Sequence, residues 1–328
     1  MRAACTSCLL LLVLAACTHH DAATTPRRAP AANVLTPAYY EVGGAVPAPN
    51  RIERQWQEAG SELWHVELPA RVTADTQDVP RVADPIEIRL FLPRPAGRVR
   101  RPLIVMFPIL SNRMLLMREF ASGFVRQGYV VAVVPRKELA FDVDRSIALA
   151  EKELRVLMMR ARQAIDWLVT QPQVDPQRIG TFGVSAGGVT ALTLMAADPR
   201  VDAGVAVFAG GPTADVLVDT VEDKFTEKTA RMRTERGWSK ERVRAALRAV
   251  IRTDPVLLAP RIRREDVLLF IATDDDSVPT RYQRRLWESL DRPEMIEVRG
   301  GHYTGVALYL PHLLQQTQAF LGKRLGAP

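Results

Sequence analysis

The sequence predicts an α/β fold of about eight mostly parallel strands flanked by helices, with a helical insertion that forms a cap. Three observations predict it. From residue 60 onward, strand-like and helix-like apolar patterns alternate. Residues 103–107 and 129–134 are continuous apolar runs, which are typical of strands buried on both faces. Residues 212–262 contain no strand pattern and interrupt the alternation.

The composition excludes several classes of protein. The 328 residues are 47% hydrophobic and 25% charged, which supports a large core and excludes a disordered chain. The net charge of +7 is moderate, and we expect no nucleic-acid partner. The only cysteines are Cys5, Cys8 and Cys17. A disulfide scaffold, a cysteine nucleophile and a cysteine-ligated zinc site are therefore excluded from the rest of the chain.

The first residues are typical of an export signal. Arg2 precedes a short apolar run at residues 9–14, and the run ends in Leu14-Ala15-Ala16-Cys17. This segment resembles the lipobox of bacterial lipoproteins, which implies a signal peptide over residues 1–16 and an acyl chain such as palmitate on Cys17. Thr18, in place of Asp, favours the outer membrane of the bacterial cell envelope, facing the periplasm. The alternative is an ordinary signal peptide, with Cys17 incidental.

Residues 17–58 are predicted to form the lipidated N-terminus and a flexible tether. Ala, Thr and Pro dominate the segment, and such a composition cannot bury enough surface to offset chain entropy. Tyr39 and Tyr40 could dock on the domain, but the composition favours a partly ordered linker. The folded domain is then residues 59–328.

Strands and helices follow in order along this domain. Residues 63–68 and 86–92 have period-two apolar spacing and predict an antiparallel start to the sheet. The runs 103–107 and 129–134 follow as parallel strands, because a helical pattern separates them. Further strands are predicted at 178–184, 201–208, 267–273 and 295–298, and helices at 111–126, 144–170, 185–197, 280–290 and 306–321.

The insertion at 212–262 is rich in basic residues. Arg244, Arg248 and Arg252 recur at i, i+4 spacing and form a cationic stripe on a predicted helix. We interpret the stripe as a solvated face. The alternative is recognition of acidic substrates or of anionic headgroups at a membrane.

The most informative motif is G-x-S-x-G at Gly183-Val184-Ser185-Ala186-Gly187, between a predicted strand and a predicted helix. A serine on a sharp strand-to-helix turn needs very small neighbours, and its hydroxyl then projects from the sheet edge next to a helix N-terminus. Ser185 is therefore the candidate nucleophile. The alternative is a glycine-rich turn in which Ser185 only caps the helix.

Residues 174–180 (Val-Asp-Pro-Gln-Arg-Ile-Gly), followed by Gly183 to Gly188, resemble the α/β-hydrolase superfamily, particularly its dienelactone hydrolase and acetyl-esterase-like branches. The resemblance extends from about residue 60 to the C-terminus. It implies an α/β-hydrolase fold and hydrolytic chemistry. Dienelactone hydrolases use a cysteine nucleophile, whereas this chain has Ser185, so the resemblance favours a serine hydrolase that cleaves esters or amides.

The remaining triad members follow from chain order in this fold. Of the five histidines, His302 lies just after the last predicted strand, in Gly300-Gly301-His302-Tyr303, and is the candidate base. The acid should follow the strand at 267–273, where Asp274, Asp275 and Asp276 are consecutive. Relatives often carry the acid four residues before the Pro of a Val-Pro pair, which selects Asp275, although charge alone cannot choose among the three.

An oxyanion hole needs two backbone N–H groups. Ala186 supplies one. The second comes from the loop after the strand at 103–107, where Pro108 has no N–H, so Ile109 or Leu110 must donate.

We therefore predict a serine hydrolase that acts on a small-molecule carboxylic ester through an acyl-enzyme, without a metal or cofactor. The charged cap predicts short or medium acyl chains. The alternatives are a serine peptidase or amidase of the same fold, and a non-catalytic binding lipoprotein. Peptidases of the prolyl oligopeptidase branch usually carry a propeller domain, for which the residues before 60 are too few.

Overall fold

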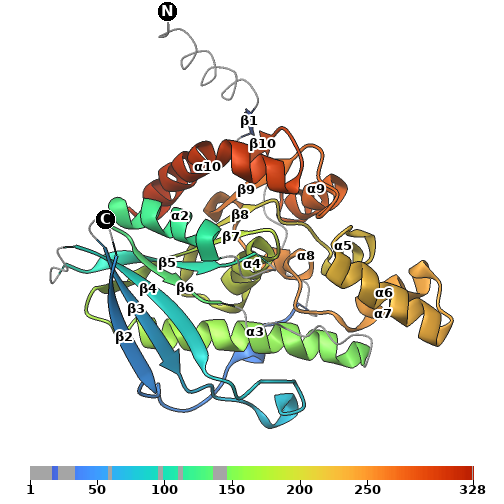
Figure 1. Ribbon diagram of the computed structural model, residues 1–328, viewed down its shortest axis with the longest axis horizontal. Coiled ribbons are helices and arrows are strands. Elements are labelled where there is room, and N and C mark those ends of the chain that lie inside the picture. The colour runs from blue at the N-terminus through green and yellow to red at the C-terminus, as the bar shows by residue number, and fades with distance from the viewer. Residues whose placement is uncertain are drawn as a thin grey trace, which may run out of the picture.

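Ten strands of the described chain form one sheet (Figure 1). The computed structural model describes residues 17–20, 34–57, 61–94, 99–109, 114–135, 146–326 and 328. The strand order is β1-β10-β9-β8-β7-β5-β6-β4-β3-β2. The strands are β1 (Cys17–His20), β2 (Arg51–Gln57), β3 (Ser61–Leu68), β4 (Ile86–Pro93), β5 (Arg101–Phe107), β6 (Val130–Val133), β7 (Val174–Val184), β8 (Val201–Val207), β9 (Val267–Ala272) and β10 (Glu294–Val298).

The centre of the sheet is parallel and its edges are antiparallel. The six strands from β10 to β6 pair in parallel. Strands β4, β3 and β2 continue one edge in antiparallel pairs, and β1 pairs antiparallel with β10 at the other edge. The eight predicted strands correspond to β3 through β10, and the mostly parallel sheet is confirmed. The two additional strands come from the segment predicted as a tether.

Helices cover both faces of the sheet, because alternate side chains of each central strand point to opposite sides. In β5, Leu103 and Val105 pack in one buried cluster with α3 and α4, whereas Ile104 and Met106 pack in another with α2 and α10. In Figure 1, α2 and α10 lie on one side of the sheet and α3 on the other. The helices are α2 (Met114–Arg126), α3 (Ile147–Leu168), α4 (Ala186–Ala197), α5 (Thr213–Asp219), α6 (Asp223–Arg236), α7 (Lys240–Val250), α8 (Pro255–Leu258), α9 (Thr280–Ser289) and α10 (His302–Leu325).

Helix α4 is apolar on all sides because it is surrounded. Its residues from Gly187 to Ala197 are buried except for Val189, and it packs on β7 and β8 as well as on α3 and α8. Neither this helix nor any other within the described residues combines the length and the apolarity needed to cross a bilayer. The burial fixes α4 firmly behind the turn that joins it to β7.

The predicted cap is present as α5 to α8, inserted between β8 and β9. Helices α5, α6 and α7 project to one side of the sheet, in yellow and orange (Figure 1). They enclose a small core of their own, which includes Leu217, Met232 and Leu247 and continues to Ala150 near the start of α3. The cap is therefore seated on α3 through apolar contacts.

Residues 34–57 correct the prediction of a flexible tether to residue 58. Tyr40 is 1% exposed, and its hydroxyl lies 3.2 Å from the hydroxyl of Thr253. The Tyr39 hydroxyl donates to Glu151 of α3 at 3.1 Å, and the same carboxylate accepts from the backbone N–H of Arg252 and Thr253. The two tyrosines dock because each has a polar group to bond, and β2 then extends the sheet. The signal peptide predicted at 1–16 lies outside the described residues.

Candidate active site

Ser185 occupies a strained turn between β7 and α4. Its backbone has φ 59° and ψ −126°, a positive-φ conformation that is uncommon for a residue with a side chain. The turn is held by hydrogen bonds from Ser185 N to Val207 O at 2.7 Å and from Gly188 N to Ser185 O at 2.9 Å. The hydroxyl makes no capping hydrogen bond to the helix. The backbone geometry is that of a sharp strand-to-helix turn, and the serine hydroxyl does not act as a helix cap.

The glycines on either side of Ser185 are required by close packing. A Cβ atom at Gly183 would lie 2.1 Å from the carbonyl oxygen of Gly187. A Cβ at Gly187 would lie 2.2 Å from the carbonyl oxygen of Phe107, at the end of β5. Both contacts are with backbone atoms that cannot move aside. The G-x-S-x-G spacing therefore reflects the approach of three backbone segments around the serine.

The loop after β9 brings one of the three aspartates to His302. The Asp275 Oδ2 atom lies 2.6 Å from His302 Nδ1, and both side chains are buried. The carboxylate also accepts from Gln283 Nε2 and from the backbone N–H of Val278, each at 2.8 Å. Asp274 and Asp276 are exposed. Burial and hydrogen bonding thus distinguish Asp275 from its neighbours, which charge alone could not do.

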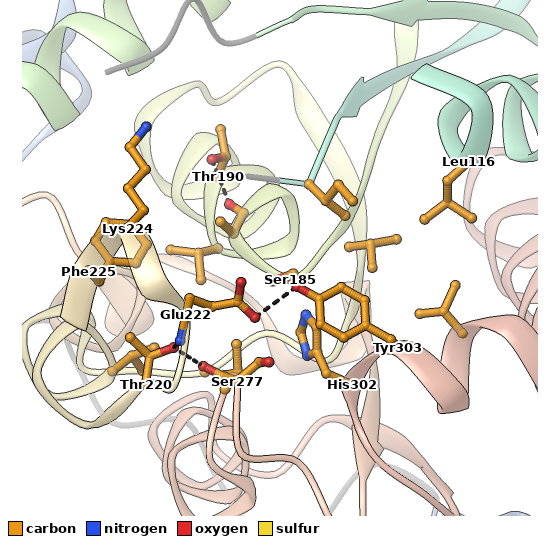
Figure 2. A pocket seen from close by; sticks show the side chains of 18 of the residues that line it. Leu116, Ser185, Thr190, Thr220, Glu222, Lys224, Phe225, Ser277, His302 and Tyr303 are labelled. Atoms are coloured by element: carbon orange, nitrogen blue, oxygen red, sulfur yellow. Dashed lines mark hydrogen bonds between the residues drawn. The ribbon is translucent and has the colours of Figure 1, made fainter. Parts of the chain in front are cut away.

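His302 and Ser185 face the same cavity, although they lie 117 residues apart in the chain. His302 is the first residue of α10, directly after Gly300 and Gly301, and Gly300 has a φ of +116° that a glycine adopts without strain. Figure 2 shows the imidazole beside Ser185. With Nδ1 turned to Asp275, the imidazole has Nε2 available for the hydroxyl.

The structure describes two of the three residues predicted for the oxyanion hole. Ala186 is the first residue of α4, so its N–H has no carbonyl partner one turn back within the helix. Ala186 and Ile109 both line the cavity that contains Ser185. Leu110 lies outside the described residues. The pair Ala186 and Ile109 is therefore the part of the prediction that the structure brings next to the serine.

The cavity has a volume of about 760 Å³ and a mainly apolar wall. On the cap side it is lined by Leu154, Val216, Leu217 and Phe225, and on the opposite side by residues of α2 and α10 such as Leu116 and Leu310. The charged cap sequence did not suggest such a wall, because its apolar side chains line the cavity while most of its basic side chains are exposed. The arrangement can accommodate a sizeable apolar substituent on either side of a bond held at Ser185.

Several polar residues of the cavity were not predicted as site residues, among them Tyr303, Glu222 and Lys224. The Tyr303 hydroxyl donates to Glu222 at 2.8 Å, which joins the histidine turn to the residue that precedes the cap helix α6 (Figure 2). Lys224, two residues further along, also lines the cavity. No motif spacing links these positions, so only the folded chain brings them to the site. Among the described residues, no group of His, Cys, Asp and Glu is placed to hold a metal ion.

The cationic stripe of the cap pairs with carboxylates. Arg244 bonds to both Asp215 and Asp219, and Arg248 bonds to Asp215. Burial would raise the pKa of Asp219, but hydrogen bonds from Arg244, Lys240, Tyr282 and Arg281 hold that pKa well below its usual range. Arg244 and Arg248 therefore bond within the cap, while Arg248 and Arg252 are also exposed, so the stripe is in part the solvated face that the sequence suggested.

Two family models match the chain. The model of the prolyl oligopeptidase family matches residues 161–327, and that of the dienelactone hydrolase family matches residues 88–230. Among curated proteins, the thiohydrolase apmlB of Arthrinium phaeospermum is 34% identical over 115 residues. That match covers 34% of this chain and 36% of the relative, so the chain matches about a third of the relative's length.

Solved structures with similar folds include esterases and a peptidase. Acetyl xylan esterase 1 from Thermoanaerobacterium sp. JW/SL YS485 aligns with a TM-score of 0.59 at 17% identity, over 85% of this chain and 97% of that one. The acetyl xylan esterase from Paenibacillus sp. R4 aligns with a TM-score of 0.63 at 17% identity, over 84% of this chain and 88% of that one. Pyrococcus horikoshii acylaminoacyl peptidase aligns with a TM-score of 0.54 at 13% identity, over 87% of this chain and 51% of that one. At these identities the likeness concerns the fold alone.

Proposed function

The chain belongs to the prolyl oligopeptidase family, within the α/β-hydrolase superfamily, and from this premise we propose that it is a serine hydrolase of carboxylic esters. Ser185 is the proposed nucleophile, His302 the base and Asp275 the residue that orients the base. The single observation that carries the proposal is the 2.6 Å contact between His302 and Asp275, beside a serine held on a positive-φ turn.

The proposed reaction proceeds in two halves. The Ser185 Oγ attacks the ester carbonyl while His302 Nε2 accepts its proton, and the backbone N–H groups of Ala186 and Ile109 stabilise the oxyanion. The intermediate collapses, the alcohol leaves with the proton from His302, and an acyl-serine remains. Water then loses a proton to His302 and attacks the acyl group, which releases the acid and restores Ser185. Asp275 holds the imidazole in the tautomer that faces the serine.

A peptidase is the second candidate, because the family model that covers half of the chain is that of prolyl oligopeptidase. The wall of the cavity favours an ester. A bound peptide brings several amide N–H and carbonyl groups that lose water on binding and need partners. The wall offers mainly aliphatic and aromatic side chains around Ser185, such as Val216, Leu217 and Phe225. An ester of an apolar acid has fewer polar groups that need hydrogen-bond partners in the cavity.

Labelling with a fluorophosphonate probe tests the nucleophile. Wild-type protein and Ser277→Ala should be labelled, whereas Ser185→Ala should not. Ser277 is a suitable control because it lines the same cavity. Equal labelling of Ser185→Ala and wild type would reject the assignment. Absence of labelling in every variant would favour a non-catalytic binding protein of this fold.

Hydrolysis rates separate an esterase from a peptidase. We expect 4-nitrophenyl butyrate to be cleaved with a kcat/KM at least about a thousandfold above that of the matched butyryl 4-nitroanilide, because the amide has the poorer leaving group. A prolyl peptide anilide serves as the second amide. Faster cleavage of the prolyl anilide than of the ester would reverse the order of the two candidates.

We also propose that the protein is a lipoprotein of the bacterial envelope, anchored at Cys17. The support is the segment Leu14-Ala15-Ala16-Cys17 in the sequence. Palmitate labelling in cells should be lost in Cys17→Ser and retained in Cys8→Ser, and the membrane-bound fraction should fall in parallel. Retained labelling in Cys17→Ser would contradict the anchor while leaving the proposed chemistry untouched.

A further inference from the structure

Lys224 is a cation in the cavity wall that has no partner of its own among the residues that the structure describes. Its side chain is half-buried and lines the cavity from α6. Within the described residues it donates no hydrogen bond and forms no ion pair. The neighbouring basic residues of the cap differ, since Arg244, Arg248 and Lys240 all pair with Asp215 or Asp219. Lys224 is therefore not required by the ion pairs that hold the cap together.

The acidic residues of the same cavity do not neutralise Lys224. Glu222 is two residues away, but its carboxylate accepts the Tyr303 hydroxyl at 2.8 Å. Figure 2 shows Glu222 directed toward Tyr303, and Lys224 extended so that its amino group lies at the end away from Ser185. Glu119, the other acidic residue of the wall, belongs to α2 on the opposite side of the cavity. The two ends of the cavity thus differ in charge.

The surroundings of Lys224 strengthen its attraction for an anion. Phe225, Val216 and Leu217 line the same side of the cavity. Because Lys224 is half-buried, its charge is screened by fewer water molecules than that of a lysine on an open surface, so a charge pair formed there is stronger. A ligand that enters the apolar part and ends in an anion would satisfy both features.

We propose that Lys224 binds a carboxylate at the far end of the acyl chain of the substrate, which makes the substrate class half-esters of apolar dicarboxylic acids. The inference rests on the proposed esterase function. The leaving alcohol must stay next to His302, which returns the proton, and His302 begins α10 on the side opposite the cap. The acyl chain then lies along the cap wall, with its terminal carboxylate at Lys224.

The test compares matched pairs of esters that differ only at the end of the chain. The 4-nitrophenyl half-esters of adipate, suberate and sebacate are compared with the neutral 4-nitrophenyl hexanoate, octanoate and decanoate. For at least one length, we expect Lys224→Met to lower kcat/KM for the half-ester about tenfold, mainly through KM, and to leave the neutral ester unchanged. Lys224→Arg should retain most of the preference, and added salt should weaken it.

Arg233→Met is the matched control, because it removes an exposed positive charge from the same helix at a position outside the cavity wall. It should retain the wild-type ratio of the two ester rates. Equal ratios in wild type and Lys224→Met at every chain length, with the neutral esters still cleaved, would overturn the inference alone. If wild type cleaves neither ester of any pair, the proposed esterase function fails as well.

Discussion

The hydroxyl of Tyr303 donates a 2.8 Å hydrogen bond to Glu222 and so connects the histidine turn to the cap across the cavity. The ring of Tyr303 also lies edge-on to His302, with 5.2 Å between their centroids. Tyr303 is 58% exposed, so little apolar packing supports this connection. This hydrogen bond therefore joins the histidine turn to the cap at the wall of the cavity.

Tyr303→Phe should loosen this connection between the histidine turn and the cap. The substitution removes a partly exposed hydrogen bond, for which we expect a loss of about 0.5–1 kcal/mol in unfolding free energy. We expect faster amide exchange at the start of α6, and a kcat/KM that rises for bulky esters relative to 4-nitrophenyl acetate. Unchanged exchange together with an unchanged ratio would show that the contact does not control access.

Asp275→Asn should impair catalysis far more than substitution of either neighbour. An asparagine at this position favours the wrong tautomer of His302, and we expect kcat to fall about 10³–10⁴-fold. Asp274→Asn and Asp276→Asn alter exposed side chains of the same loop and serve as controls. We expect both to retain kcat within about threefold of wild type, since neither touches the base. A large loss in either control would assign the acid elsewhere.

Gly183→Ala should disrupt the turn that carries the serine. The added methyl group would meet the carbonyl oxygen of Gly187 at 2.1 Å, so the backbone must shift, at an expected cost of about 3 kcal/mol or more. Gly43→Ala is the control, because its Cβ would have no atom within 4 Å. Thermal unfolding should separate the two variants clearly. Similar melting temperatures would contradict the close packing described for the elbow.

Asp219 of the cap should make the free energy of unfolding depend on pH in the acid range. Although burial opposes it, the hydrogen bonds from Arg244, Lys240, Tyr282 and Arg281 lower the pKa of this carboxyl in the folded state. A lowered folded-state pKa gives stability that is present above the unfolded pKa of about 4 and is lost as the pH falls below it, by up to about 1.4 kcal/mol per pH unit.

Urea unfolding at several pH values measures this contribution. Wild type should be more stable than Asp219→Asn at neutral pH, and the difference should shrink as the pH falls from 4 to 3. Asp276→Asn provides an exposed comparison outside the network. A difference between wild type and Asp219→Asn that stays constant with pH would exclude the carboxylate as its source.

The sequence predicted those parts of the fold that leave an apolar pattern. The runs at 103–107 and 129–134 became central strands because both of their faces are buried. Strand β2 escaped prediction because Arg51–Gln57 is largely polar and joins the sheet through backbone pairing with β3. Tyr40 was placed in a linker because burial of one aromatic among prolines depends on a partner, Thr253, that is distant in the chain.

Some residues of the candidate site could likewise be predicted from the sequence, and others could not. Ser185 could be chosen from the sequence because the turn requires small residues at fixed spacing around it. His302 could be chosen because the fold fixes the order of the triad residues along the chain. Choosing among three adjacent aspartates requires the burial and the bonds of Asp275, which only the folded loop supplies. Lys224 lines the cavity and has no partner within the described part of the chain, and no local spacing in the sequence encodes either property.

The hydrogen bonds of Glu151 determine where a shortened form of this protein can begin. The carboxylate accepts hydrogen bonds from Tyr39, near the N-terminal end, and from Arg252 and Thr253, where the cap returns to the sheet. A recombinant domain that begins at residue 59 would lack Tyr39, Tyr40 and strand β2, and would expose the edge of β3 and the base of the cap to water. Expression vectors should therefore begin at or before residue 34.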